Sequence, residues 1–204
     1  MGNIGIIGLG NEGSNLAVAL ARNGHVLTLV DFDKIEHKNL SSQVYTNKYI
    51  RRSKDEIIST YLNNPHLHTY KHLKLENISD YKAFEDCAVI FNCTDNMKSR
   101  YLLADYANNS NLDQLFCDIR SAGMESTIVN FWNHEVNYYK TTLYTDDVAT
   151  DTAPCGTRNK AHYNLLRAAY LANWLDQPVK KWMHQIFTIT GNSLLEVITI
   201  KERG

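Results

Sequence analysis

The chain of 204 residues has no apolar run long enough to cross a membrane and no large excess of either charge. A membrane-spanning helix needs about 20 consecutive apolar residues, and the opening stretch MGNIGIIGLG is too short and too glycine-rich for a secretory signal. Lysine and arginine number 21 against 22 aspartate and glutamate, so no broad basic field exists for nucleic acid or an anionic membrane. We therefore expect a cytoplasmic protein with neither kind of partner.

Cysteine is also scarce. The four cysteines lie far apart and form no C-x-x-C pair, which argues against a zinc ribbon. Cys87, Cys93 and Cys117 stand in apolar stretches, so we expect them to be small core residues. Cys155 alone stands in a polar stretch, TDTAPCGTRNK.

Apolar, β-branched stretches alternate with amphipathic ones in the first part of the chain. Their periodicity predicts strands at residues 3–8, 25–31, 66–73, 87–93 and 114–119, and helices at 14–24, 53–64 and 96–109. Strands and helices that alternate in this way form a parallel sheet with helices on both faces.

The pattern changes after Gly123. We predict two antiparallel strands at 126–132 and 136–144, a polar loop at 146–160, a helix at 161–175, and a closing hairpin at 185–200 that turns near Gly191. No internal repeat or linker is visible, so we expect one domain over residues 1–204. The predicted fold class is α/β, a Rossmann-like, doubly wound and mostly parallel sheet with an antiparallel C-terminal part.

The segment GLGNEG, residues 8–13, matches the G-x-G-x-x-G pattern. It follows a predicted strand and opens a predicted helix, which is the context of a dinucleotide-binding turn. Gly8 would permit the tight turn, Gly10 would let the backbone approach a phosphate, and Gly13 would let helix and strand pack closely. The alternative is a tight turn without a ligand.

Two acids are placed to serve a nucleotide. Asp31 ends the second predicted strand eighteen residues after Gly13, where a carboxylate can accept ribose hydroxyls, or it could be a simple cap. Asp95 follows the fourth predicted strand, at the edge where open α/β sheets bind ligands. Asp95 could hold Mg²⁺ against phosphates, or Asp95 or Asn96 could cap the following helix; both interpretations remain open.

The ordered combination of GLGNEG, VDFDKIEHKNLSSQ, SKDE and CTDNMKSRYLL resembles the E1-like adenylyltransferases, which include the ubiquitin-activating enzymes and the bacterial ThiF, MoeB and HesA proteins. The resemblance covers about residues 3–130. CDIRSAGMEST also resembles the D-x-R stretch of compact ThiF-like proteins of bacteria and phages.

This resemblance implies that the protein binds ATP and Mg²⁺ and adenylates the C-terminal carboxylate of a ubiquitin-like protein or peptide, as a homodimer. Catalysis would consist mostly of positioning and charge neutralisation, because the attacking carboxylate is already an anion. The matched positions assign Asp31 and Asp33 to the family's D-x-D motif with Asp31 on the ribose, Asn39 and Gln43 to the phosphate-binding loop, Lys54 to the phosphates and Asp95 to Mg²⁺.

The sequence departs from the family in two places. Ser42 stands where the family has an arginine, and a hydroxyl cannot make a charged bidentate phosphate contact. We hypothesise that Arg51 or Arg52 supplies that cation, the alternative being that both are solvated surface residues. Many relatives also carry, before the first strand, a helix whose arginine reaches the partner's ATP, and the first strand is predicted here from residue 3. Arg100 and Arg120 are candidate substitutes, Arg100 the more structural and Arg120 nearer the crevice.

Cys155 precedes a predicted helix, with Arg158 and Lys160 nearby, and these surroundings favour a thiolate. Larger family members use a loop cysteine for a thioester or persulfide, which makes Cys155 a candidate nucleophile. The alternative is a partly exposed cysteine without a role. The histidines 66, 68 and 72 are expected on an exposed strand face without a function.

Three functions remain after this reasoning. The first is the ATP-dependent adenylyltransferase. The second is an NAD-dependent oxidoreductase, which would leave Lys54 and Asp95 without a task. The third is an inactive relative that acts as a scaffold or as half of a heterodimer, and Ser42 supports it.

Overall fold

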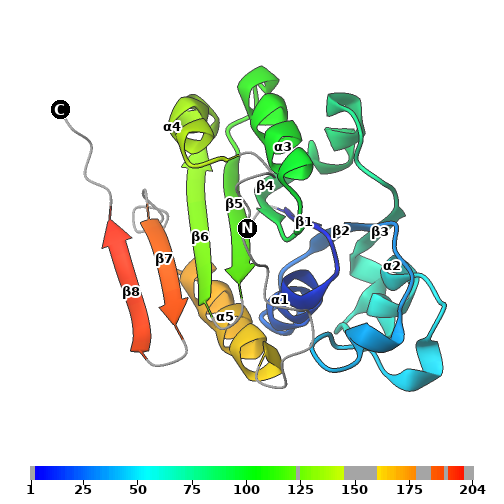
Figure 1. Cartoon of the computed structure of the whole chain (residues 1–204). Helices are drawn as coiled ribbons and strands as arrows, with labels where there is room; N and C mark the ends of the chain where they lie inside the picture. The colour runs from blue at the N-terminus through cyan, green and yellow to red at the C-terminus, as the bar shows by residue number, and fades with distance from the viewer. Residues whose placement is uncertain (1–2, 123–124, 145–159, 178–184, 191–192, 200–204) are drawn as a thin grey trace.

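A single β-sheet forms the centre of the molecule (Figure 1). The structure is a computed structural model and describes residues 3–122, 125–144, 160–177, 185–190 and 193–199. Within these ranges the sheet has eight strands in the order β3-β2-β1-β4-β5-β6-β7-β8. They are β1 Asn3–Ile7, β2 Leu27–Asp31, β3 Thr69–His72, β4 Cys87–Asn92, β5 Leu115–Ala122, β6 Glu125–Trp132, β7 Gln185–Thr190 and β8 Ser193–Thr199.

The direction of the strands changes at β5. Strands β3, β2, β1, β4 and β5 are parallel neighbours, whereas β5–β6, β6–β7 and β7–β8 pair antiparallel. The sequence order reverses its direction across the sheet between β1 and β4, so the carboxyl ends of these two strands border the crevice where doubly wound sheets bind ligands. The predicted fold class is confirmed.

Five α-helices accompany the described strands: α1 Asn11–Arg22, α2 Lys54–Ile58, α3 Met97–Asn109, α4 Val136–Thr141 and α5 Lys160–Leu175. Short 3₁₀ turns lie at His37–Asn39, Asn47–Tyr49, Ser59–Tyr61, Pro65–Leu67, Ile78–Phe84 and Asn133–Glu135. Helix α2 is shorter than predicted, because the chain tightens into a 3₁₀ turn from Ser59. Of the helices in the described ranges, none has both the length and the apolar content to cross a membrane.

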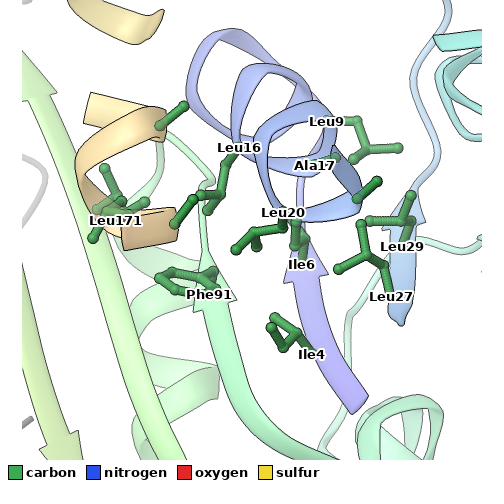
Figure 2. Close-up of a cluster of buried hydrophobic side chains, with 14 of the residues drawn as sticks. Ile4, Ile6, Leu9, Leu16, Ala17, Leu20, Leu27, Leu29, Phe91 and Leu171 are labelled. Atoms are coloured by element: carbon green, nitrogen blue, oxygen red, sulfur yellow. The ribbon is translucent and has the colours of Figure 1, made fainter. Parts of the chain in front are cut away.

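Helices cover both faces of the sheet. On one face Ile4 and Ile6 of β1 pack with Leu16 and Leu20 of α1 and Leu171 of α5, so that α5 lies against α1 (Figure 2). On the other face a second cluster joins strand residues to side chains of α3, α4 and the 3₁₀ turn Ile78–Phe84. Successive residues of a strand point to opposite faces, which is why β1 contributes to both clusters.

The predicted strand at 136–144 is wrong, because Val136–Thr141 is helix α4. Val136 and Tyr139 lie three residues apart, and both are buried in the same cluster. The Tyr139 ring stacks on Phe131 with 4.0 Å between centroids. A spacing of three places two side chains on one face of a helix, whereas a strand would point them to opposite sides.

The expectation of an exposed histidine face is wrong for His68, which is buried. Its Nδ1 accepts the backbone N–H of Leu27 at 3.2 Å, and its Nε2 lies 2.9 Å from the carbonyl oxygen of Asn63. These two contacts are satisfied together when Nε2 carries the proton, so His68 fastens β2 to the segment before β3.

The described cysteines are core residues, as predicted. Cys87 and Cys117 are buried, Cys93 is half-buried, and all three are free thiols. Burial raises the pKa of Cys87 to about 11, so it stays protonated at neutral pH.

Candidate functional site

A glycine-rich turn joins β1 to α1. Gly8 has a φ of +85°, and Gly10 occupies the N-cap position of α1, which therefore has no side-chain cap. A Cβ on Gly13 would lie 1.9 Å from the carbonyl oxygen of Gly8, so only glycine allows helix and turn to approach this closely. The first backbone N–H groups of an uncapped helix are donors available to an anion.

The carboxylate of Asp31 fastens the end of β2 to this turn. Its Oδ2 accepts the N–H of Leu9 at 2.6 Å and its Oδ1 accepts the N–H of Asp33 at 2.7 Å. Asp31 is buried. Burial raises the pKa of the Asp31 carboxyl above its ordinary 3.8, and Lys54 and the two backbone N–H groups offset part of that rise.

We expect this raised pKa to lower stability as the pH rises. In the window between 3.8 and the higher folded-state pKa, the native state binds more protons than the unfolded state, so the contribution of Asp31 to the free energy of unfolding falls with pH. The measurement is urea unfolding of wild type and Asp31→Asn between about pH 4 and pH 7. The wild type should lose stability relative to the variant as the pH rises; a difference that stays constant or moves the other way would contradict the burial argument.

Lys54 places an ammonium between two acids. It extends from the first turn of α2, is buried, and its Nζ lies 3.0 Å from Oδ2 of Asp33 and 3.9 Å from Oδ2 of Asp31. Its backbone N–H also donates to the carbonyl of Asp33 at 3.0 Å. Three of the predicted site residues are therefore together at the carboxyl end of β2.

Asn39 and Ser42 fix the loop after β2. Asn39 is buried, and its side-chain oxygen accepts the N–H of Glu36 at 2.8 Å. The Ser42 hydroxyl donates to Oδ1 of Asn11, and its carbonyl accepts from the side chain of Asn15 at 3.2 Å. Ser42 therefore ties the loop to the first turns of α1 at the position where a cation was expected.

Gln43 brings an amide to the glycine-rich turn. Its Nε2 would lie 4.0 Å from a Cβ built on Gly10. In the part of the chain that the structure describes, its Oε1 is buried and has no hydrogen-bond partner. A buried acceptor without a donor is costly, and a bound ligand or water would satisfy it.

Arg51 and Arg52 lie outside this cluster of contacts, and both are exposed. Arg51 has a φ of +70°, and its N–H donates to the carbonyl of Ile35 at 2.8 Å. The Arg52 guanidinium pairs with Glu56 on the outer side of α2. The suggestion that one of them contacts phosphate stays a prediction.

Asp95 lies in the turn after β4, the strand beside β1. Asn96 caps α3 by accepting the N–H of Ser99 at 2.9 Å, so the cap alternative belongs to Asn96 rather than to Asp95. Asp95 is exposed, and its carboxylate has no hydrogen-bond or ion-pair partner among the described residues. The same residues contain no cluster of three or more His, Cys, Asp or Glu side chains that could hold a metal, so an ion at Asp95 would need oxygens from a ligand.

The fully buried carboxylate of Asp118 contacts residues that support this turn. Its Oδ1 lies 3.2 Å from Nε of Arg100 and accepts a hydrogen bond from the Asn92 amide at 3.1 Å. Its Oδ2 lies 2.6 Å from Nε of Arg120 and accepts a hydrogen bond from the Tyr139 hydroxyl at 3.0 Å. Both guanidinium groups proposed as substitute cations are thus engaged by one acid. The D-x-R string in the sequence contains Asp118 and its partner Arg120, but it does not indicate the contacts with Arg100, Asn92 and Tyr139.

The two arginines connect Asp118 to two different segments of the chain. Arg100 donates to the carbonyl of Thr94 at 3.1 Å and so supports the turn that carries Asp95. Arg120 donates to the carbonyl and hydroxyl oxygens of Thr142 at 2.7 and 2.9 Å, after α4.

A second charged contact was missed by the sequence reasoning. Glu12, inside the glycine-rich turn, pairs with Arg167 of α5 and accepts a hydrogen bond from Ser121 at 2.7 Å. An acid inside an otherwise anion-attracting turn was the signal that a nearby cation should exist. Cys155 lies outside the described residues.

Comparison with known proteins identifies the family of this chain. A model of the ThiF family matches residues 2–198. The adenylyltransferase and sulfurtransferase uba4 of Aspergillus clavatus is 37% identical over 110 residues, which are 50% of this chain and 22% of that protein. The adenylyltransferase and sulfurtransferase MOCS3 of Drosophila sechellia is 35% identical over 106 residues, 49% of this chain and 23% of that protein. The chain therefore spans about a fifth of the length of these curated relatives.

Solved structures share the fold over nearly the whole chain. Crystal structures of E. coli MccB with ATP and with MccA superpose with TM-scores of 0.71 and 0.73 at 16% identity. They cover 97% and 98% of this chain and 63% and 64% of the MccB chains. The crystal structure of PaaA superposes with a TM-score of 0.71 at 15% identity, and the match covers 98% of this chain and 64% of the PaaA chain.

Proposed function

The chain belongs to the ThiF family, and from that premise we propose that it is an E1-like adenylyltransferase. It would use ATP with Mg²⁺ to adenylate the C-terminal carboxylate of a ubiquitin-like protein or peptide and release pyrophosphate. The observation that carries this proposal is the unpaired carboxylate of Asp95, at the same sheet edge as the uncapped amino terminus of α1. An uncapped helix attracts phosphate, and a cation bound between that phosphate and Asp95 would give the exposed acid a role at this edge.

The side chains fit a nucleotide at this edge. Asp31, at the end of β2, would accept the ribose hydroxyls. The first N–H groups of α1 would hold phosphate oxygens next to Gly10, and the Nε2 of Gln43, which lies near Gly10, would donate to them as well. Lys54 would neutralise phosphate charge in addition to that of Asp33.

Asp95 would hold a Mg²⁺ ion together with phosphate oxygens. The ion, when bound, would supply neutralisation of the charge that develops on the α-phosphate and the leaving pyrophosphate. The substrate carboxylate would form a bond to the α-phosphorus while the bond to the bridging oxygen breaks, and the electron pair would leave with pyrophosphate. No general base is needed because the nucleophile is an anion, so this chain would contribute orientation and charge.

The proposal also covers organisation and partners. It places one adenylation domain over residues 1–204 and a homodimer as the working unit. Relatives support the substrate class: MccB has been crystallised with the peptide MccA, and uba4 and MOCS3 are named as adenylyltransferases and sulfurtransferases. Cys155 is proposed as the nucleophile whose thiolate would attack the adenylated carboxyl carbon and displace AMP, which would leave the substrate as a thioester.

The test is calorimetric titration of ATP, with and without Mg²⁺, into wild type and Asp95→Asn. We expect Mg²⁺-dependent ATP binding that weakens at least about tenfold in the variant, because a neutral amide is a poorer ligand for a divalent cation. Asp113→Asn is the matched control: this acid is exposed just before β5, at the opposite edge of the sheet, and its removal should leave binding unchanged.

Other outcomes distinguish the remaining functions. Binding of NAD with indifference to ATP would overturn the adenylyltransferase in favour of an oxidoreductase. ATP binding that neither needs Mg²⁺ nor changes in Asp95→Asn would favour a non-catalytic binding protein. The contact between Ser42 and Asn11 supports that alternative, because the position of the family arginine is filled by a hydroxyl that already has a partner in the fold.

A further inference from the structure

An acid and a base from distant parts of the chain meet at the glycine-rich turn. Glu12 lies in the first turn of α1 and is buried, and its Oε2 accepts from Nε of Arg167 at 3.0 Å. The Nη2 of the same guanidinium donates to Oε1, so the pair is bidentate. Arg167 belongs to α5 and is only 1% exposed. The Ser121 hydroxyl of β5 also donates to Oε1 of Glu12, so the ion pair lies beside the crevice.

The acid is at an unfavourable place for the proposed ligand. The amino terminus of a helix attracts anions, and a carboxylate there competes with a phosphate for the same positive potential. A bidentate guanidinium contact cancels that charge locally, and the cancellation is effective because both groups are shielded from water.

The other basic side chains near the crevice have different partners. Lys54 contacts Asp33, and Arg100 and Arg120 contact Asp118. Arg51 and Arg52 are exposed. Among the described residues, Arg167 is the arginine whose guanidinium contacts a side chain of the glycine-rich turn itself.

We propose that Arg167 is a positioning residue of the nucleotide site, which neutralises Glu12 so that a polyphosphate can approach the amino terminus of α1. Helix α5 thereby removes a negative charge from the phosphate-binding turn, and the neutral pair does not replace the cation that the family has at the position of Ser42. This inference rests on the proposed function and adds a residue to its phosphate-binding side.

The inference predicts an effect that grows with the number of phosphates. Glu12→Gln removes the negative charge and leaves the guanidinium uncompensated, so ATP affinity should rise about threefold to tenfold while adenosine affinity stays constant. Arg167→Met leaves the carboxylate uncompensated, so ATP should bind at least about tenfold more weakly, AMP less so, and adenosine equally. The double variant Glu12→Gln/Arg167→Met should return close to wild type.

The experiment is calorimetric titration of ATP, AMP and adenosine into wild type, the three variants and Asp176→Asn. The last is a matched control, because Asp176 accepts from Asn23 at 3.1 Å and lies 3.2 Å from His25, and so ties α5 to the opposite end of α1. It should change none of the affinities.

The outcomes are separable. Equal changes for all three ligands, or no change in any variant, would overturn the role of Arg167 and leave a structural tie between the helices. If Arg167→Met does not fold, Glu12→Gln and the double variant decide the question. Failure of the wild type to bind ATP would instead overturn the proposed function, and the inference with it.

Discussion

Asp118→Asn is expected to lower the free energy of unfolding by about 3–5 kcal/mol, the range typical when one partner of a buried ion pair is removed. Asp118 is fully buried and meets two guanidinium groups, a hydroxyl and an amide. An asparagine keeps one oxygen but turns an NH₂ group toward donors. The buried guanidinium group of Arg100 and the half-buried one of Arg120 would then lose their counter-charge, and the turn that carries Asp95 would lose support through Arg100.

Urea unfolding followed by circular dichroism measures this loss. Asp105→Asn is the control, because Asp105 faces Lys140 at 3.4 Å in an exposed pair and should cost less than about 1 kcal/mol. If Asp118→Asn cannot be purified, Tyr139→Phe removes a single hydroxyl from the same acid and should cost about 1–2 kcal/mol. Losses as small as that of the control in both variants would contradict the assigned importance of Asp118.

Gly13→Ala should be the second most damaging substitution, with a loss of about 3 kcal/mol or more. In an exposed helix the same change would stabilise by up to about 1 kcal/mol through helix propensity. Here the new Cβ would lie 1.9 Å from the carbonyl oxygen of Gly8, a backbone atom that cannot rotate away. Helix α1 must therefore move from β1, and the Leu9 N–H would be drawn from Asp31.

Gly10→Ala provides the comparison for thermal and urea unfolding. The nearest atom to its Cβ would be Nε2 of Gln43 at 4.0 Å, an ordinary contact, so the loss of stability should stay at about 1 kcal/mol or less. On the proposed function the same methyl group would obstruct phosphate, and ATP affinity would fall without unfolding. Similar stabilities of the two alanine variants would show that the close approach at Gly13 is not a constraint.

Sequence reasoning succeeded where the determinant is local. The glycine pattern, the acid at the end of a strand and the alternation of apolar stretches are read from neighbouring residues. They placed β1 and β2 within two residues and α1 within three, since α1 begins at Asn11, inside the glycine pattern. It failed for α4, because aromatic and β-branched residues suggested a strand while the buried pair Val136 and Tyr139 has helical spacing.

In the candidate site, too, the features determined by neighbouring residues were predicted and the tertiary contacts were not. The local order of residues put Asp31 at the end of a strand, and the family resemblance assigned Asp33 and Lys54 to the same site, where the structure brings them together. Local order left open whether Asp95 holds Mg²⁺ or whether Asp95 or Asn96 caps the helix. The hydrogen bond from the N–H of Ser99 identifies Asn96 as the cap residue. The partners of Ser42 and of Glu12 are tertiary contacts, and no spacing rule in a single sequence connects Glu12 to a residue 155 positions later.

That separation has a consequence for synthesis on the ribosome. Chains grow at about 5–20 residues per second, so roughly 8–31 s pass between the appearance of Glu12 and that of Arg167. During this interval the acid has no counter-ion and the α5-facing side of α1 has no cover. The glycine-rich turn, although encoded first, can therefore be among the last parts of the molecule to reach its final geometry, and a nascent chain stalled before α5 should be recognised by chaperones as incomplete.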